Sequence, residues 1–366
     1  MAVLSNLRLR PLLLACLMLP LFGCVGGRGM LRQEAQAGAH EEDRRLVPPD
    51  LSWTLSDGAR IPVRVWQPAS LHPAPVRAVV LALHGVDDSR DAWELPGPVL
   101  AAHGIAVYAP DQRGFGAAPG RGQWPGTDRL VDDVAEMVRL VQATHPALPV
   151  FVIGESMGGA VALCLAARPD HPPVAGFVLL SPAVWSSAQM SPLMTASLWT
   201  ASTFLPNWKL TGRELPLHVL ASDNRAALYR LSYDPLTLKE TRADSLRGMV
   251  ALMTRAAAAA PQVRGPVLVA YGAHDQLVPA AAMAASWRLF PDGVRRAFYP
   301  QGYHLLMRDH DRQAVTDDVA SWIFDSERAL PSGSDVAAAA WTAGSSWETR
   351  VPFWLPANLS RLVVGF

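Results

Sequence analysis

A serine flanked by glycines stands between a short apolar stretch and a helical stretch. Residues 154–158 read Gly-Glu-Ser-Met-Gly, and the central residue is Ser156. Residues 150–153 before them have the length and apolarity of a buried strand, and residues 159–167 after them are typical of a helix. A strand-to-helix turn this tight needs small neighbours, and it lifts the serine hydroxyl above the sheet. The pattern therefore predicts a nucleophilic serine.

A serine hydroxyl is a weak nucleophile and needs an adjacent base. Among the ten histidines, His304 follows the predicted strand 296–299 and so lies at the carboxyl edge of the sheet, where the serine also points. His310 belongs to the charged stretch 308–311, which is typical of a solvated helix start. We therefore expect His304 to be the base.

The base needs a carboxylate that orients its ring. Asp275 follows the predicted strand 267–271 after a short loop, again at the carboxyl edge of the sheet. We expect this residue to be the acid of a Ser156, Asp275 and His304 triad.

Charge that develops on the attacked carbonyl oxygen needs preorganised amide donors. The amide of Met157 directly follows the nucleophile, and the loop after the predicted strand 78–83 reads His-Gly-Val and offers the amide of Val86. We expect these two amides to form the oxyanion hole. The chemistry needs no metal and no cofactor.

These motifs resemble those of a known family. The matching residues are 84–85 (His-Gly), 109–116 (Ala-Pro-Asp-Gln-Arg-Gly-Phe-Gly), 154–159, 233–236 (Tyr-Asp-Pro-Leu), 272–275 (Gly-Ala-His-Asp) and 302–304 (Gly-Tyr-His). They are similar to the monoacylglycerol lipase and lysophospholipase branch of the α/β-hydrolases, a group of serine aminopeptidase S33-type hydrolases. The triad order Ser, Asp, His is also that of α/β-hydrolases.

This resemblance covers about residues 51–327. It implies acyl-enzyme hydrolysis of carboxylic esters, with monoacylglycerols or lysophospholipid-like single-chain lipids as substrates. The family usually carries a second histidine where Gln112 stands, and that difference leaves the substrate open.

The elements that must position these side chains alternate along the chain. Apolar runs of strand length occupy residues 78–83, 105–109, 150–153, 177–180, 267–271 and 296–299, and helical segments separate them. A hairpin around Asp57-Gly58 precedes them. The alternation predicts an α/β-hydrolase fold, with a mostly parallel central sheet flanked by helices, over residues 50–330.

One interval, from about residue 185 to 260, is too long for a simple crossover and predicts an inserted helical cap. It is rich in large apolar side chains, which include Trp185, Met190, Trp199, Phe204, Met249 and Met253. These side chains either bury the core of the cap or line a groove for an acyl chain, and the sequence leaves both open. The tail, residues 331–366, carries Trp341, Trp347 and Trp354 and has no role that the sequence assigns.

The composition excludes some classes of protein. Lysine plus arginine and aspartate plus glutamate number 32 each in 366 residues, so no basic field is present to hold a nucleic acid. The hydrophobic fraction of 50% is enough for a large core.

The N-terminus has the pattern of an export signal. Arg8 and Arg10 precede an apolar run at residues 12–22, which is too short for a comfortable transmembrane helix. The run ends in Leu-Phe-Gly-Cys24, which resembles the lipobox of bacterial lipoproteins, and Val25 favours the outer membrane. This resemblance implies a signal peptide at residues 1–23, a lipid on Cys24 that anchors the protein in the cell envelope facing the periplasm, and a flexible tether at residues 24–49. An ordinary signal peptide with a chance cysteine is the alternative.

Other functions stay open from sequence alone. A peptidase or a cofactor-free perhydrolase can use the same triad, because the choice of leaving group depends on the cap. A non-catalytic lipoprotein that binds an apolar ligand is the alternative from another class of protein.

Overall fold

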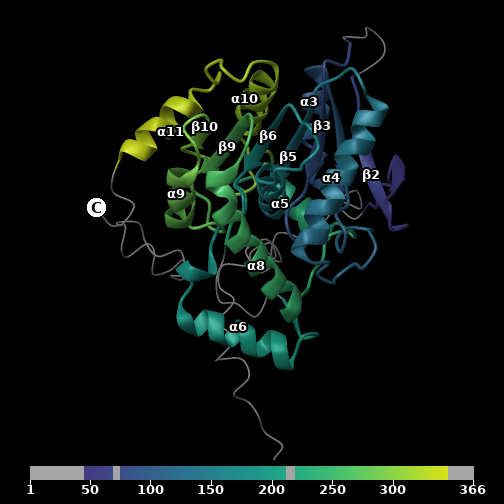
Figure 1. Ribbon diagram of the computed structural model, residues 1–366, viewed down its shortest axis with the longest axis vertical. Helices are drawn as coiled ribbons and strands as arrows, with labels where there is room; N and C mark the ends of the chain where they lie inside the picture. The colour runs from purple at the N-terminus through teal and green to yellow at the C-terminus, as the bar shows by residue number, and fades with distance from the viewer. Residues whose placement is uncertain (1–44, 69–74, 212–218, 345–366) are drawn as a thin grey trace, which may run out of the picture.

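Residues 45–68, 75–211 and 219–344 are described by a computed structural model of the chain (Figure 1). The expected signal peptide, Cys24 and most of the tether lie outside these ranges, as do Trp347 and Trp354 of the tail. Within these ranges, no helix combines the length and the apolar character that crossing a membrane requires.

An eight-stranded sheet forms the centre of the protein, in the order β1-β2-β4-β3-β5-β6-β9-β10. The strands are β1 (Leu51–Thr54), β2 (Arg60–Trp66), β3 (Ala78–Leu83), β4 (Ile105–Pro110), β5 (Val150–Glu155), β6 (Gly176–Leu180), β9 (Val267–Gly272) and β10 (Arg295–Tyr299). β2 pairs antiparallel with β1 and with β4, and the remaining neighbours pair in parallel. The predicted hairpin and the mostly parallel sheet are confirmed.

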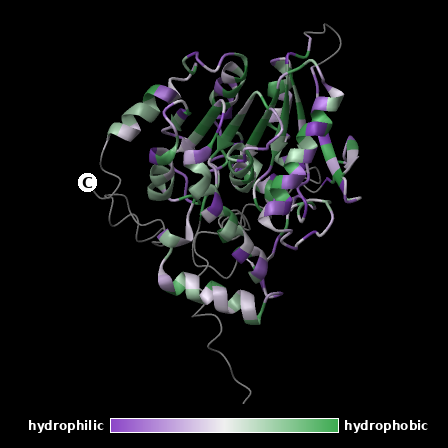
Figure 2. Ribbon diagram, in the orientation of Figure 1, coloured by the Kyte–Doolittle hydropathy of each residue, from purple (hydrophilic) through white to green (hydrophobic). Residues whose placement is uncertain are grey.

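Helices cover both faces of the sheet, and this explains why its strands are apolar throughout. In β3, alternate residues such as Val79 and Leu81 pack into one hydrophobic core, while Val80 and its alternates pack into a second core on the other face. Figure 2 shows strands that are coloured mainly as hydrophobic, and helices around them that carry both hydrophobic and hydrophilic residues.

The first core is closed by α4 (Thr127–Thr144), α5 (Met157–Ala166), α8 (Ala243–Ala259) and α9 (Ala280–Leu289). The second core is closed by α3 (Pro96–Ala102) and α10 (Arg312–Phe324). Short 3-10 helices lie at η3 (Arg90–Trp93), η4 (Ser187–Gln189) and η6 (Ala260–Gln262).

A largely helical insertion separates β6 from β9, where the sequence predicts the cap. It contains α6 (Pro192–Phe204), α7 (Arg225–Tyr233), α8 and the short pair β7 (Lys209–Leu210) and β8 (Thr241–Arg242). α8 packs against α5 and so helps to cover the sheet, whereas α6 packs on α8 on the side away from the sheet (Figure 1). The last part of the insertion therefore belongs to the layer of helices that covers the first core.

Part of the tail packs onto the sheet. α11 (Ser334–Ala343) contacts β10, an edge strand. Its Trp341 stacks on Phe298 at 4.8 Å between ring centroids and meets Trp287 edge-on at 4.7 Å. This aromatic cluster fixes a helix to which the sequence alone assigned no role.

Candidate active site

The backbone at Ser156 is strained in the way that a nucleophile-bearing turn requires. Ser156 lies between β5 and α5 with φ 54° and ψ −112°, a combination that is uncommon for a residue other than glycine. Its amide donates to the carbonyl of Leu180 at 3.0 Å, and its carbonyl accepts from Ala183 at 3.0 Å. A Cβ on Gly158 would stand 2.5 Å from the carbonyl oxygen of Leu83, so only glycine fits there. The turn is therefore held between two neighbouring strands.

His304 and Asp275 are paired in a dry environment. Nδ1 of His304 lies 2.8 Å from Oδ2 of Asp275, and the two side chains are 1% and 0% exposed. Oδ1 of Asp275 accepts from the amides of Leu277 and Val278 at 2.8 and 2.9 Å. The carboxylate is thus fixed from one side while it orients the imidazole from the other.

Two loops that carry this pair are joined by main-chain hydrogen bonds. The amide of His274 donates to the carbonyl of Gly302 at 2.9 Å, and that of Ala273 donates to Tyr299 at 3.0 Å. Because β9 and β10 are parallel neighbours, their carboxyl ends place both loops at the same edge of the sheet.

The environment of His304 has opposing effects on its pKa. Burial lowers the pKa, but the Asp275 carboxylate raises it through its charge and its hydrogen bond, and Glu155 and Asp309 also raise it. The net result is a pKa above the ordinary 6.5. His304 is therefore a better proton acceptor than a free histidine, provided that the pH keeps it neutral.

Ser156 and His304 line one small cavity of about 20 Å³, together with Val86. A Cβ on Gly85 would lie 3.4 Å from Cβ of Ser156, so the loop after β3 runs directly beside the serine. No hydrogen bond joins Ser156 Oγ to His304 in the described part of the chain; such contacts often shorten only when substrate is bound. The structure thus brings all three expected triad residues to one place.

The two expected oxyanion donors flank the same serine. Met157 is the first residue of α5, and Val86 follows Gly85 in the cavity wall. Within the described residues, neither main-chain amide takes part in a hydrogen bond. Two amides available beside a serine hydroxyl can bind a carbonyl oxygen that gains negative charge.

His84 shapes the loop that carries Val86. Its Nε2 accepts from the amide of Gln112 at 3.0 Å, so the proton is on Nδ1, which donates to the carbonyl of Gly85 at 2.7 Å. The Gln112 side chain donates to the carbonyl of His84 at 2.7 Å. Burial lowers the pKa of His84 and favours this neutral form.

A buried ionic cluster beside Ser156 was missed from sequence. Arg308 binds Glu155 at 2.9 Å and also binds Asp88, and each of the three is at most 6% exposed. Asp309 accepts from Ser222 at 2.6 Å and from the amide of Tyr303 at 2.7 Å. The expectation of a solvated helix start is therefore wrong for Arg308 and Asp309. No local sequence signal marks them as buried, because their partners Asp88, Glu155 and Ser222 are distant in the chain.

The large apolar residues of the insertion do not line this cavity. Trp185, Met190, Met249 and Met253 are buried in the first hydrophobic core, and Trp199 and Phe204 are 52% and 70% exposed. The apolar lining that the structure describes at Ser156 comes instead from Val86, Leu231 and Leu305. Of the two roles left open, the structure favours core packing for the four buried side chains.

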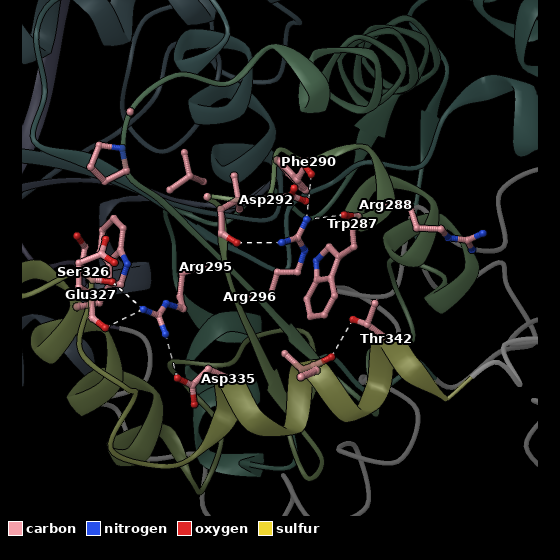
Figure 3. Close-up of a pocket in the computed structure, with 18 of the residues that line it drawn as sticks. Trp287, Arg288, Phe290, Asp292, Arg295, Arg296, Ser326, Glu327, Asp335 and Thr342 are labelled. Atoms are coloured by element: carbon pink, nitrogen blue, oxygen red, sulfur yellow. Dashed lines mark hydrogen bonds and ion pairs between the residues drawn. The ribbon is translucent and has the colours of Figure 1, made fainter.

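A larger cavity of about 1040 Å³ lies among α9, β10 and α11 (Figure 3). Its arginines are engaged within the fold. Arg295 binds Asp335 and the carbonyls of Ser326 and Glu327, and Arg296 donates to the carbonyls of Trp287 and Phe290 at the end of α9. Ser156 and His304 are not among its lining residues, so it is separate from the candidate site.

The chain belongs to the serine aminopeptidase S33 family, whose family description matches residues 74–311. Its fold is the α/β-hydrolase fold. A monoglyceride lipase from Saccharomyces cerevisiae, solved as a soluble variant in complex with a substrate analog, superposes with a TM-score of 0.63 at 20% identity, covering 77% of this chain and 97% of that one.

The match with curated relatives covers most of each relative. A monoacylglycerol lipase of Mycolicibacterium smegmatis is 28% identical over 280 residues, which is 73% of this chain and 93% of the relative. The Homo sapiens monoglyceride lipase is 28% identical over 291 residues, which is 76% and 91% of the two chains. The family match and these relatives indicate a carboxylic ester hydrolase of the lipase family.

Proposed function

We propose that the protein hydrolyses carboxylic esters of single-chain lipids, such as monoacylglycerols or lysophospholipids, through an acyl-enzyme on Ser156. The observation that carries the proposal is the shared cavity, which holds Ser156 on its strained turn and His304 paired with Asp275. The names of the relatives support the lipid substrate.

This geometry supports a two-step acyl transfer. His304 takes the proton of Ser156 as the hydroxyl attacks the ester carbonyl, and Asp275 stabilises the imidazolium that forms. The amides of Val86 and Met157 hold the oxyanion. His304 then protonates the leaving alcohol, and water repeats the attack on the acyl-enzyme to release the fatty acid.

The acyl preference is tested with p-nitrophenyl esters from acetate to palmitate. We expect kcat/KM to rise with chain length up to a limit, because each methylene that leaves water contributes up to about 0.8 kcal/mol. A flat profile, or one that is highest at acetate, would contradict a lipid substrate while leaving ester hydrolysis intact. Parallel assays with peptide amides separate the esterase from the peptidase alternative.

We also propose that Cys24 carries a lipid that anchors the enzyme in the bacterial cell envelope, at the outer membrane facing the periplasm. The lipobox-like sequence before Cys24 motivates this proposal. We expect a metabolic fatty-acid label to enter the wild type and not Cys24→Ala, with unchanged ester hydrolysis by the two purified proteins. If mass spectrometry finds a mature protein that begins beyond residue 24 and carries no lipid, the anchor proposal is wrong and the protein is secreted without a lipid.

A further inference from the structure

Two buried oxygen atoms at the cavity of Ser156 have no hydrogen-bond partner in the part of the chain that the structure describes. They are Oδ1 of Asp87 and Oγ1 of Thr237. Both residues line the cavity, and they are only 7% and 6% exposed. A polar atom that is buried without a partner destabilises a fold, so two of them beside a reactive serine need an explanation.

Asp87 has two further features that are uncommon in a folded protein. Its φ is 61°, a left-handed conformation that is uncommon for residues other than glycine, asparagine and aspartate. Burial raises the pKa of its carboxyl to about 7, although the hydrogen bond from Thr241 acts in the opposite direction. An uncommon backbone conformation and a desolvated carboxyl at one residue, next to Val86, are typical of positions kept for function rather than for stability.

The orientation of the Asp87 carboxyl is fixed from the insertion. Thr241 donates its hydroxyl to Oδ2, and the amide of Leu238 donates to the main-chain carbonyl of Asp87 at 2.8 Å. Because Oδ2 is engaged, Oδ1 remains as an acceptor. Thr237 belongs to the same segment of the insertion, so Asp87 and Thr237 line the cavity from two different parts of the chain.

We propose that Asp87 and Thr237 bind a hydroxyl group on the alcohol part of the ester, so that the enzyme selects esters of polyols over esters of simple alkanols. This inference rests on the proposed function and adds the residues that recognise the alcohol. A substrate hydroxyl donates to Oδ1 of Asp87 and accepts from Oγ1 of Thr237, which satisfies both atoms at once.

The size and position of the cavity fit this assignment. A space of about 20 Å³ holds about one water molecule, which is also the size of one hydroxyl oxygen. The cavity is shared with His304, which protonates the leaving alcohol in the proposed mechanism. The alcohol part of the ester therefore lies on this side of the serine.

The test compares 1-monobutyrin with n-propyl butyrate, because the two esters share the acyl group and differ in the hydroxyls of the alcohol. We expect the wild type to have a kcat/KM for monobutyrin about tenfold above that for propyl butyrate, which corresponds to about one hydrogen bond. Titration of released butyric acid measures both rates.

Variants assign this preference to the two residues. In Asp87→Gly, which suits the φ of 61°, and in Thr237→Val, we expect the ratio to fall to within about threefold of one. Thr237→Ser keeps the hydroxyl and should keep the ratio. Asp87→Asn provides a second substitution that tolerates the backbone; it offers an amide donor in place of the acceptor and should also reduce the ratio.

The outcomes separate this inference from the proposed function. A wild-type ratio near one, or an unchanged ratio in Asp87→Gly and Thr237→Val, would show that the two oxygens merely bind water. Equal losses on both esters would show a structural role and would also overturn the inference. If the wild type hydrolysed neither ester nor any longer homologue, the proposed function itself would fail.

Discussion

Ser156→Ala is expected to lower kcat by about 10³-fold or more and to abolish labelling by a fluorophosphonate probe. The reason is the loss of the hydroxyl that attacks the ester, since the substituted protein keeps the rest of the cavity. The side chain of Ser156 does not cap α5, so its removal leaves no helix amide newly without a partner. We therefore expect the melting temperature to stay close to that of the wild type.

Ser181 offers a matched control for this substitution. It is a buried serine beyond the end of the neighbouring strand β6, it also has a positive φ of 41°, and its hydroxyl has no partner in the described part of the chain. Ser181→Ala should keep turnover within about threefold and keep the probe on Ser156. Probe labelling and ester hydrolysis that persist in Ser156→Ala would place the nucleophile elsewhere.

Asp275→Asn is expected to lower kcat by about 10⁴-fold with little change in the fold. Oδ1 of Asp275 accepts from two main-chain amides, so the asparagine must keep its oxygen there and turn its amide group toward His304. Nδ1 of His304 then has to accept, and the proton moves to Nε2. An imidazole in that tautomer cannot take the proton of Ser156. Steady-state kinetics with a p-nitrophenyl ester measure the loss.

Asp318→Asn is the matched control, because it also replaces a buried aspartate by asparagine. Asp318 is a fully buried aspartate on α10 that accepts from Tyr299 at 2.9 Å and from Ser334 at 2.6 Å, and it does not line the cavity of Ser156. Asp318→Asn should lower the melting temperature while kcat of the folded protein stays near the wild-type value. A comparable loss of kcat in both variants would mean that Asp275 acts through stability rather than through His304.

The pH dependence of the wild type and of Asp275→Asn provides a second readout. Since the pKa of His304 is raised and only the neutral form is a base, the acid limb of kcat/KM in the wild type should lie above pH 6.5. Removing the Asp275 charge leaves burial as the largest influence, and burial lowers the pKa of His304. The acid limb of the residual activity in Asp275→Asn should therefore move to lower pH. A shift to higher pH would contradict the assigned pairing.

Local sequence was sufficient for the strands of the main sheet and for the candidate triad. Strands such as β3 and β5 are apolar throughout because both faces are covered, and that pattern is visible in the residues themselves. Side chains that follow the carboxyl ends of parallel strands meet at one edge of the sheet. The positions of Ser156, Asp275 and His304 in the chain therefore predicted that they would meet.

Only the tertiary structure decided which polar and apolar side chains are buried. Arg308 lies in a charged stretch, yet it is buried because Asp88 in the loop after β3 and Glu155 at the end of β5 compensate its charge. Trp341 packs on Phe298 because α11 returns to an edge strand that is distant in sequence. Asp87 has no local feature that sets it apart until its φ, its burial and its bond to Thr241 are known. Periodicity reports the face that a segment buries, whereas compensation of a buried charge depends on partners brought together by long-range folding.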